Sequence, residues 1–260
     1  MLVHVPESTE AKPRTEASRL RGVVGGRNGR DKKGDGMVQT SVCLGVGIYS
    51  IPEAARLLRT KPGAVRRWLD DERPVVKRLF DPSEATISFL ELMELHFIKM
   101  FRSEGISLQT IRRAAAAASQ KFHTDYPFAV RRFDTDGRSI FATLAREAEL
   151  KRADAVLVED LRRGQYVFDQ IMRPFFRKLE YGDRDEVRRF WPMEPKGRIV
   201  LDPERKFGKP IDAETGVPTK SIYDAVMAGG GQDYQTVAEW LDVPVPAVQC
   251  AVRFEESLAP

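Results

Sequence analysis

The chain has 260 residues, of which 42% are hydrophobic and 31% are charged, and its formal net charge is +4. It contains no run of about 18 apolar residues, which argues against a membrane span, and its first residues lack the apolar core of a signal peptide. Two cysteines, Cys43 and Cys250, and three scattered histidines (His4, His96 and His123) offer no metal-binding spacing. We therefore expect a cytoplasmic protein without a metal or other cofactor.

Residues 1–46 are rich in Gly, Arg, Lys and Ser and show no apolar periodicity. This composition predicts a disordered N-terminal extension, because such a segment buries too little apolar surface to fold. Met37 stands just before the globular pattern begins. It is a candidate translation start, which leaves open whether the residues before it are made.

Two short helices are predicted at the start of the globular part. Ser50 and Glu53 form an S-x-x-E capping box with Pro52 in the first turn, which predicts a helix to about Leu58. A second helix is predicted from Pro62 to about Leu69, ended by Pro74. The β-branched segment VVKRLF, residues 75–80, is predicted to form a wing strand.

Two longer helices follow in the pattern. Ser88 and Glu91 form another capping box before FLELMELHFIKMF, which is apolar on nearly every side and predicts a helix buried over most of its surface. Gly105 ends that helix. Ser107 caps the next one, SLQTIRRAAAAASQKF, whose alanine run strongly favours a helix.

The middle of the chain has a different character. In RRFDTDGRSIFATL, residues 131–144, an Asp-Gly pair between two apolar runs predicts a β-hairpin. Residues 150–180 mix short strand-like and helical pieces whose order the pattern leaves open. RRFWPMEPKGRIVLDP predicts two strands about a proline-rich turn, and residues 221–227 predict a helix ended by Gly229–Gly231.

Two stretches share the spacing of small and apolar residues that is typical of a helix-turn-helix: IPEAARLLRTKPGAVRRWL (residues 51–69) and TVAEWLDVPVPAVQCAV (residues 236–252). Each has a small residue inside its first helix, Ala55 or Ala238, where two helix backbones would approach closely. The usual turn glycine is replaced by Arg59 and Asp242. The alternative interpretation is a pair of ordinary αα-hairpins, which pack with similar spacing.

Charge separates the two helix pairs. Five basic residues and no acidic ones lie between Arg56 and Arg67, whereas residues 198–260 hold six Lys or Arg against ten Asp or Glu, a net of −4. Lysine and arginine neutralise phosphates, and arginine also bridges the guanine edge. The predicted DNA contacts are therefore Arg59, Lys61, Arg66, Arg67 and Lys77. The nearly uncharged face from Pro244 to Cys250 is predicted to contact protein.

Two sets of motifs resemble known families. YSIPEAARLLRTKPGAVRRWL followed by FLELMELHFIKMFRSEGISLQTIRRA resembles the MerR-type winged helix-turn-helix, whose GxSLxxI signal is present here as Gly105, Ser107, Leu108 and Ile111. From residue 198 onward, IVLDP, FGKP, TGVPT, AGG and a terminal helix pair ending in RFE resemble the domain of unknown function 433.

Together the ordered chain resembles the larger VapB-type antitoxins. That resemblance implies a PIN-domain ribonuclease toxin as partner and repression of the pair's own promoter through double-stranded operator DNA. We expect a homodimer, because operator symmetry usually mirrors protein two-fold symmetry. The alternative function is a stand-alone MerR-like transcription regulator that senses a small ligand.

These expectations combine into one predicted architecture. It is mainly α, of the α+β class, with a winged helix-turn-helix at residues 47–122. A mixed α/β segment with β-hairpins follows at residues 123–197. A small helical helix-turn-helix domain at residues 198–260 completes the chain.

The sequence predicts no enzyme, since it contains no nucleophile motif or phosphate loop. The acidic pairs Asp134–Asp136 and Asp183–Asp185 are metal candidates, but DTDG and YGDRDE have turn chemistry and are interpreted as turns. A toxin-binding surface is not defined by the motifs. Basic side chains are plausible partners for an acidic ribonuclease site, although solvated surface is the favoured interpretation of the candidates, which are Arg162, Arg163, Arg188 and Arg189.

Overall fold

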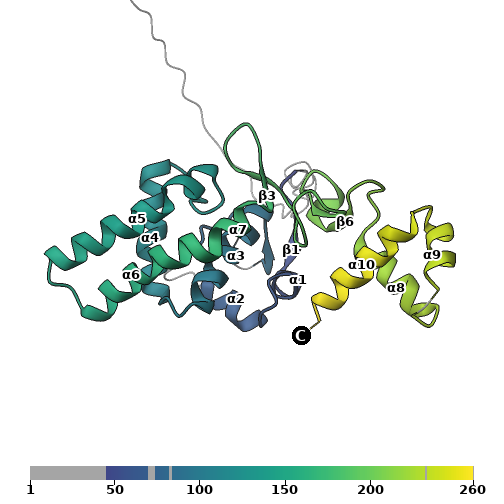
Figure 1. Cartoon of the computed structure of the whole chain (residues 1–260), viewed down its shortest axis with the longest axis horizontal. Coiled ribbons are helices and arrows are strands. Elements are labelled where there is room, and N and C mark those ends of the chain that lie inside the picture. The colour runs from purple at the N-terminus through teal and green to yellow at the C-terminus, as the bar shows by residue number, and fades with distance from the viewer. Residues whose placement is uncertain (1–44, 70–73, 82–83, 232, 260) are drawn as a thin grey trace, which may run out of the picture. The chain divides into compact units, whose positions relative to one another are not determined.

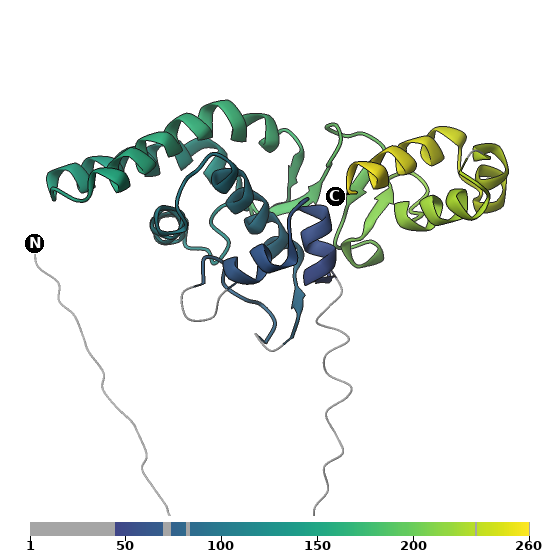
Figure 2. The same cartoon turned by 90° about the horizontal axis from the view of Figure 1, so that it is seen from below.

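The computed structural model describes residues 45–69, 74–81, 84–231 and 233–259. These belong to one compact unit, residues 38–260. Within it the protein is mainly helical with two small antiparallel sheets, so the predicted α+β class is confirmed (Figures 1 and 2). Most of the predicted disordered extension and Met37 lie outside the described residues.

The first helix pair begins where the sequence predicted it. Ser50 Oγ accepts a hydrogen bond from the Glu53 backbone N–H, and the Glu53 carboxylate accepts one from the Ser50 N–H at 2.9 Å, which is the predicted capping box. Helix α1 spans Ile51–Leu57 and α2 spans Pro62–Trp68. Between them Arg59 has a φ of 48°, the left-handed conformation that usually favours glycine.

The predicted wing strand at residues 75–80 is wrong, because residues 74–81 form bends and contain no strand. The strand partner comes later: β2 (Thr86–Ile87) pairs antiparallel with β1 (Tyr49–Ser50). A side chain explains the difference. Arg78 is largely buried and forms an ion pair with Glu91 at 3.1 Å, so side-chain contacts hold this stretch in place of a backbone ladder.

Helices α3 (Phe89–Ser103) and α4 (Leu108–Phe122) start at the predicted serine caps. Ser88 and Glu91 form the second predicted capping box. Helix α3 is buried over most of its surface, as its apolar composition predicted. It therefore lies inside the main hydrophobic core.

The predicted hairpin at residues 131–144 is wrong, because the whole stretch lies inside one helix, α5 (Arg131–Leu150). The glycine that suggested a turn serves helix packing. A Cβ atom on Gly137 would lie 2.3 Å from Cε2 of Phe168, so only glycine leaves room for that ring. The sequence pattern could not distinguish this close approach from a turn.

Helix α6 (Ala155–Val167) runs back alongside α5 (Figures 1 and 2). A Cβ atom on Gly164 would lie 2.4 Å from Cδ1 of Phe141, so the two helical segments exchange glycine–phenylalanine contacts. The chain continues through a π-helical turn, Phe168–Met172, into α7 (Arg173–Phe176). Residues 150–180, whose order the pattern left open, are thus largely helical.

A four-stranded antiparallel sheet follows, in the order β3-β4-β5-β6. Its strands are Leu179–Tyr181, Val187–Phe190, Ile199–Leu201 and Pro210–Asp212. Strands β4 and β5 confirm the prediction of two strands about the proline-rich turn. Phe190 pairs with Leu201, which joins the predicted middle segment to the C-terminal segment in one sheet.

The C-terminal helices are α8 (Thr219–Ala228), α9 (Tyr234–Leu241) and α10 (Val245–Ser257). The predicted small residue Ala238 is buried, as are Val237, Val243, Val248 and Ala251 at the predicted apolar positions. Asp242 has a φ of 52°. The turn position therefore adopts the same left-handed backbone in both helix pairs, which confirms their common frame.

One contact joins the start of the described chain to a distant turn. Tyr49 is 1% exposed and its hydroxyl donates a hydrogen bond to the Gly208 carbonyl at 2.6 Å. The Ile48 N–H donates to the Phe207 carbonyl at 2.9 Å. Gly208 ends a short 3-10 turn, Lys206–Gly208, with a φ of 80°, and a Cβ atom there would lie 2.3 Å from Tyr49 Oη. Glycine is required at this position for both reasons.

The main hydrophobic core runs from Tyr49 to Leu201, so the N-terminal helices and the middle helices share it. Phenylalanine rings fill its centre: Phe97 meets Phe133 and Phe175 edge to face, with ring centroids 5.7 and 5.1 Å apart. A second cluster lies among α8, α9 and α10. Among the described residues, no helix combines the length and apolar character needed to cross a membrane.

Glu94 places a carboxyl group inside this core. Its Oε1 accepts hydrogen bonds from the backbone N–H groups of Phe128 and Ala129 at 2.7 and 2.8 Å. Burial raises the pKa of Glu94 to about 8, although these two N–H donors oppose the shift. Between about pH 4.5 and 8 the folded protein therefore holds a proton that the unfolded chain has lost.

We predict that Glu94→Gln removes a pH dependence of stability. The wild-type protein should lose stability as pH rises from 5 to 8, by about 1.4 kcal/mol per pKa unit of the shift. The amide keeps the acceptor for Phe128 and Ala129 and carries no charge, so the variant's melting temperature should exceed that of wild type increasingly over this range. A difference in melting temperature between variant and wild type that stays constant from pH 5 to 8 would contradict this prediction. Glu147→Gln, an exposed change on α5, is the control.

Candidate nucleic-acid interface

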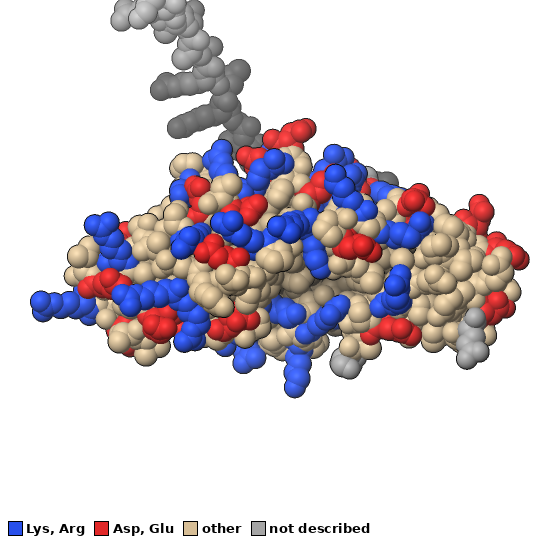
Figure 3. Space-filling model, viewed as in Figure 1, with Lys and Arg blue, Asp and Glu red and all other residues tan. Residues whose placement is uncertain are grey.

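Helix α2 presents the predicted DNA-contacting side chains. Val65 and Trp68 face the core, which turns Lys61, Arg66 and Arg67 outward, and all three are exposed. Within the described residues none of these three forms an ion pair. Figure 3 shows basic side chains projecting from the edge where α1 and α2 lie in Figure 1. Among the described residues, this surface is electropositive and its three cations lack a carboxylate partner.

The structure brings three of the predicted residues into one groove. Arg59, Lys61 and Arg67 line a hollow of about 770 Å³ beside α1 and α2. Leu258 and Ala259, which follow α10, form part of its wall. The end of the C-terminal helix therefore borders the predicted DNA-reading surface.

The remaining predicted residues differ in their surroundings. Arg66 is exposed but does not line the groove. Lys77 forms an exposed ion pair with Asp125 at 2.7 Å. Such surface pairs contribute about 0–1 kcal/mol, so Lys77 needs little free energy to release Asp125 for another anion.

A buried ion pair between α1 and α10 was not found from sequence. Arg56 Nη1 donates to Glu255 Oε2 at 2.5 Å, and the Thr219 hydroxyl of α8 donates to the other carboxylate oxygen. The Glu255 side chain is 2% exposed and that of Arg56 is 38% exposed. Arg59 also donates to Ser257 Oγ at 2.9 Å. No sequence signal pairs residues about 200 positions apart, so only the fold reveals this contact.

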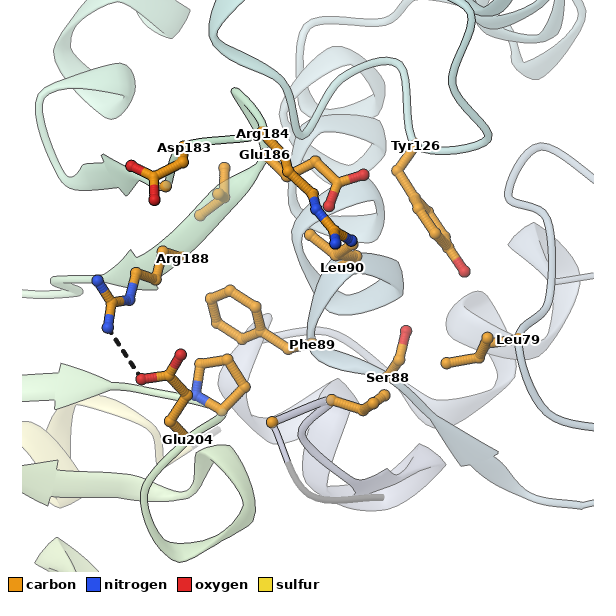
Figure 4. Close-up of a pocket in the computed structure, with 15 residues that line it drawn as sticks. Leu79, Ser88, Phe89, Leu90, Tyr126, Asp183, Arg184, Glu186, Arg188 and Glu204 are labelled. Atoms are coloured by element: carbon orange, nitrogen blue, oxygen red, sulfur yellow. Dashed lines mark hydrogen bonds and ion pairs between the residues drawn. The ribbon is translucent and has the colours of Figure 1, made fainter. Parts of the chain in front are cut away.

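The four arginines considered as toxin contacts all have acidic neighbours. Arg162 pairs with Glu149, Arg163 with Glu159, Arg188 with Glu204, and Arg189 with both Glu180 and Asp202. Figure 4 shows Arg188 and Glu204 at one side of a hollow of about 720 Å³ between the β3–β4 turn and the start of α3. Because both signs of charge line it, this hollow does not select a ligand by charge.

The acidic pairs have separate structural roles. Asp134 and Asp136 lie inside helix α5, so the interpretation of DTDG as a turn is wrong. As described above, Gly137 of this motif makes room for the Phe168 ring inside a helix. Asp183 and Asp185 lie in the turn between β3 and β4, as predicted. Asp136 pairs with Lys121 at 2.8 Å. Among the described residues no group of three His, Cys, Asp or Glu side chains is placed to hold a metal ion.

The second helix pair presents a different surface. Pro244, Pro246 and Gln249 are exposed on the face of α10 that corresponds to the basic face of α2. Trp240 on α9 is 74% exposed, an apolar side chain that the helical pattern of this stretch did not single out. This surface offers apolar contact area and almost no positive charge.

Comparison with known proteins adds a distant relationship. The chain is 24% identical over 212 residues to a Mycobacterium tuberculosis protein named "Putative antitoxin VapB45", covering 75% of this chain and 87% of that protein. It is also similar to the X-ray crystal structure of Rv2018 from Mycobacterium tuberculosis, with a TM-score of 0.64 and 20% identity over 80% of this chain and 98% of that chain. No protein-family model matches the chain. The fold is therefore shared with a solved protein, while the two resemblances drawn from motifs stay predictions.

We predict that removing the charge of Arg56 destabilises the protein more than removing the charge of Glu255. Arg56→Gln leaves a carboxylate buried with Thr219 alone, which should lower the free energy of unfolding by about 1–3 kcal/mol. Glu255→Gln leaves a guanidinium that already contacts water, so its cost should be smaller. Urea unfolding of both variants and of the double variant measures the difference. The prediction fails if Glu255→Gln is the more damaging change. Lys220→Gln, which breaks only the surface pair with Asp224, is the control.

Proposed function

We propose that this chain is the antitoxin of a type II toxin–antitoxin pair, which neutralises a PIN-domain ribonuclease toxin and represses its own operator. The observation that carries the proposal is the distant relative named as an antitoxin, since the similarity extends over most of both chains. The chain also shares its fold with a solved protein over most of both chains, and this similarity concerns the fold alone. The PIN-domain identity of the partner follows from the VapB-type resemblance of the sequence.

The operator-binding part of the proposal assigns DNA contact to α2. Its exposed lysine and arginines are held on a helix fixed by Val65 and Trp68, and cations of this kind supply the salt-dependent part of DNA affinity. We propose a homodimer, in which two copies of α2 read two half-sites. The alternative, a stand-alone MerR-like regulator, would bind DNA in the same way but would have no toxin partner.

We predict a measurable salt signature of α2. If Lys61, Arg66 and Arg67 each neutralise one phosphate, the log–log slope of affinity against salt should be about −3 per subunit, from roughly −0.9 per contact. The double variant Arg66→Ala/Arg67→Ala should flatten the slope by about two. The measurement is fluorescence anisotropy on a duplex from upstream of the protein's own gene, at several salt concentrations.

The matched control lies on the second helix pair. Gln249→Ala changes the corresponding exposed face of α10, which carries no positive charge, so the slope should stay unchanged. If Gln249→Ala abolishes operator binding while the double-arginine variant keeps it, the two helix pairs have been assigned in reverse order. The C-terminal pair would then be the DNA reader.

We predict that a short open reading frame lies next to the gene for this chain, that its product arrests growth of a bacterial host, and that co-expression of this chain relieves the arrest. The two proteins should also purify together through a tag on either one. Arg66→Ala/Arg67→Ala should still relieve the arrest, because DNA contact and toxin contact are separate in this proposal. Intact operator binding without growth relief or co-purification would favour the stand-alone regulator.

A further inference from the structure

A small cavity lies where α1, α3, the four-stranded sheet and α10 meet. Its volume is about 210 Å³. Most of the residues that line it are apolar and come from segments far apart in the chain, among them Leu57, Leu92, Phe175, Phe190, Phe254 and Leu258. This volume lies below the roughly 300–1,000 Å³ that is typical of pockets for drug-sized ligands, which favours a compact ligand.

Three cations line this cavity, and no carboxylate from the described part of the chain does. They are Arg59 at the helix turn, Lys99 on α3 and Lys178 before β3. Lys178 donates to the Pro192 carbonyl at 3.0 Å and Arg59 donates to Ser257. Within the described residues, none of the three forms an ion pair. Like charges held together without a counter-charge raise one another's free energy, and a bound anion would relieve this repulsion.

The protonation of the lining agrees with this account. Partial burial, and then the charge of Arg59, lowers the pKa of Lys99. Burial, with Lys99 as the next contribution, lowers the pKa of His96 to about 3, so its imidazole is neutral near pH 7. The ring packs edge-on against Phe175 and Phe190, with centroids 4.6 and 5.2 Å away. Its Nδ1 is buried without a hydrogen-bond partner among the described residues.

We propose that this cavity is a binding site for a small organic monoanion, a carboxylate with a short apolar tail. The carboxylate would accept hydrogen bonds from Lys99 and Lys178, and the tail would lie against the phenylalanine and leucine walls. The combination of an apolar wall and a few convergent polar groups is typical of small-molecule sites. Inorganic phosphate would meet the cations but leave the apolar wall without a partner. This site is independent of the proposed function.

Hexanoate is the probe, with acetate, hexan-1-ol and inorganic phosphate as comparisons at matched ionic strength. Isothermal titration on the full chain should show one hexanoate per chain, bound at least about tenfold more tightly than acetate, hexan-1-ol or phosphate. In nitrogen-detected imidazole spectra the His96 signals should shift on titration, while those of His123 should stay unchanged. Equal affinity for the alcohol, tighter binding of phosphate, or no binding of hexanoate would overturn the proposal.

Charge variants test the cations directly. Lys99→Met keeps the length and apolar stem of the side chain and should weaken hexanoate binding about tenfold, while Lys99→Arg should retain it. Lys151→Met, at the exposed end of α5, is the matched control and should bind as wild type does. Unchanged affinity of Lys99→Met would overturn the proposal. If Lys99→Met does not fold, loss of binding in the charge-retaining Lys99→Arg variant would do so.

Discussion

The buried carboxylate of Glu255 is the constraint on which the arrangement of the C-terminal segment depends. A carboxylate out of water must be paired and hydrogen-bonded, and here its partners come from α1 and α8, through Arg56 and Thr219. The hydrogen bonds to the Glu255 carboxylate therefore bring α1, α8 and α10 together at this residue. The groove beside α2 and the cavity around His96 both border this point. Each uses a wall that exists only because α10 is held against the first helix pair.

The two helix pairs show how one backbone frame supports two surfaces. Both place a non-glycine residue in the left-handed conformation at the turn, Arg59 in one and Asp242 in the other. Both bury a small residue where their helices cross. Packing sets these inward positions, while the outward positions are free to vary. That freedom leaves α2 with lysine and arginine and α10 with proline and glutamine on the corresponding faces.

Features that depend on neighbouring residues, such as helix caps, were predictable from the sequence. Contacts between residues far apart in the chain were not. The capping boxes at Ser50 and Ser88, the helix pairs and the strands about the proline-rich turn each depend on residues a few positions apart. The Asp136–Gly137 pair misled for a physical reason: glycine admits a tight turn and a close aromatic ring equally well, and only the position of Phe168 decides between them. The basic face of α2 was recognisable from its charge run. The Arg56–Glu255 pair and the three cations around His96 depend on tertiary packing, which has no local signal.

The separation of Tyr49 and Arg56 from their partners has a consequence for how the chain is made. Gly208 follows Tyr49 by 159 positions and Glu255 follows Arg56 by 199. At a synthesis rate of roughly 5–20 residues per second, Arg56 waits on the order of ten seconds or more before Glu255 exists. Throughout that interval the first helix pair has no C-terminal helix beside it. The contact of α1 with Glu255 thus forms only after α10 has been synthesised, and a chain that stops before Glu255 lacks it.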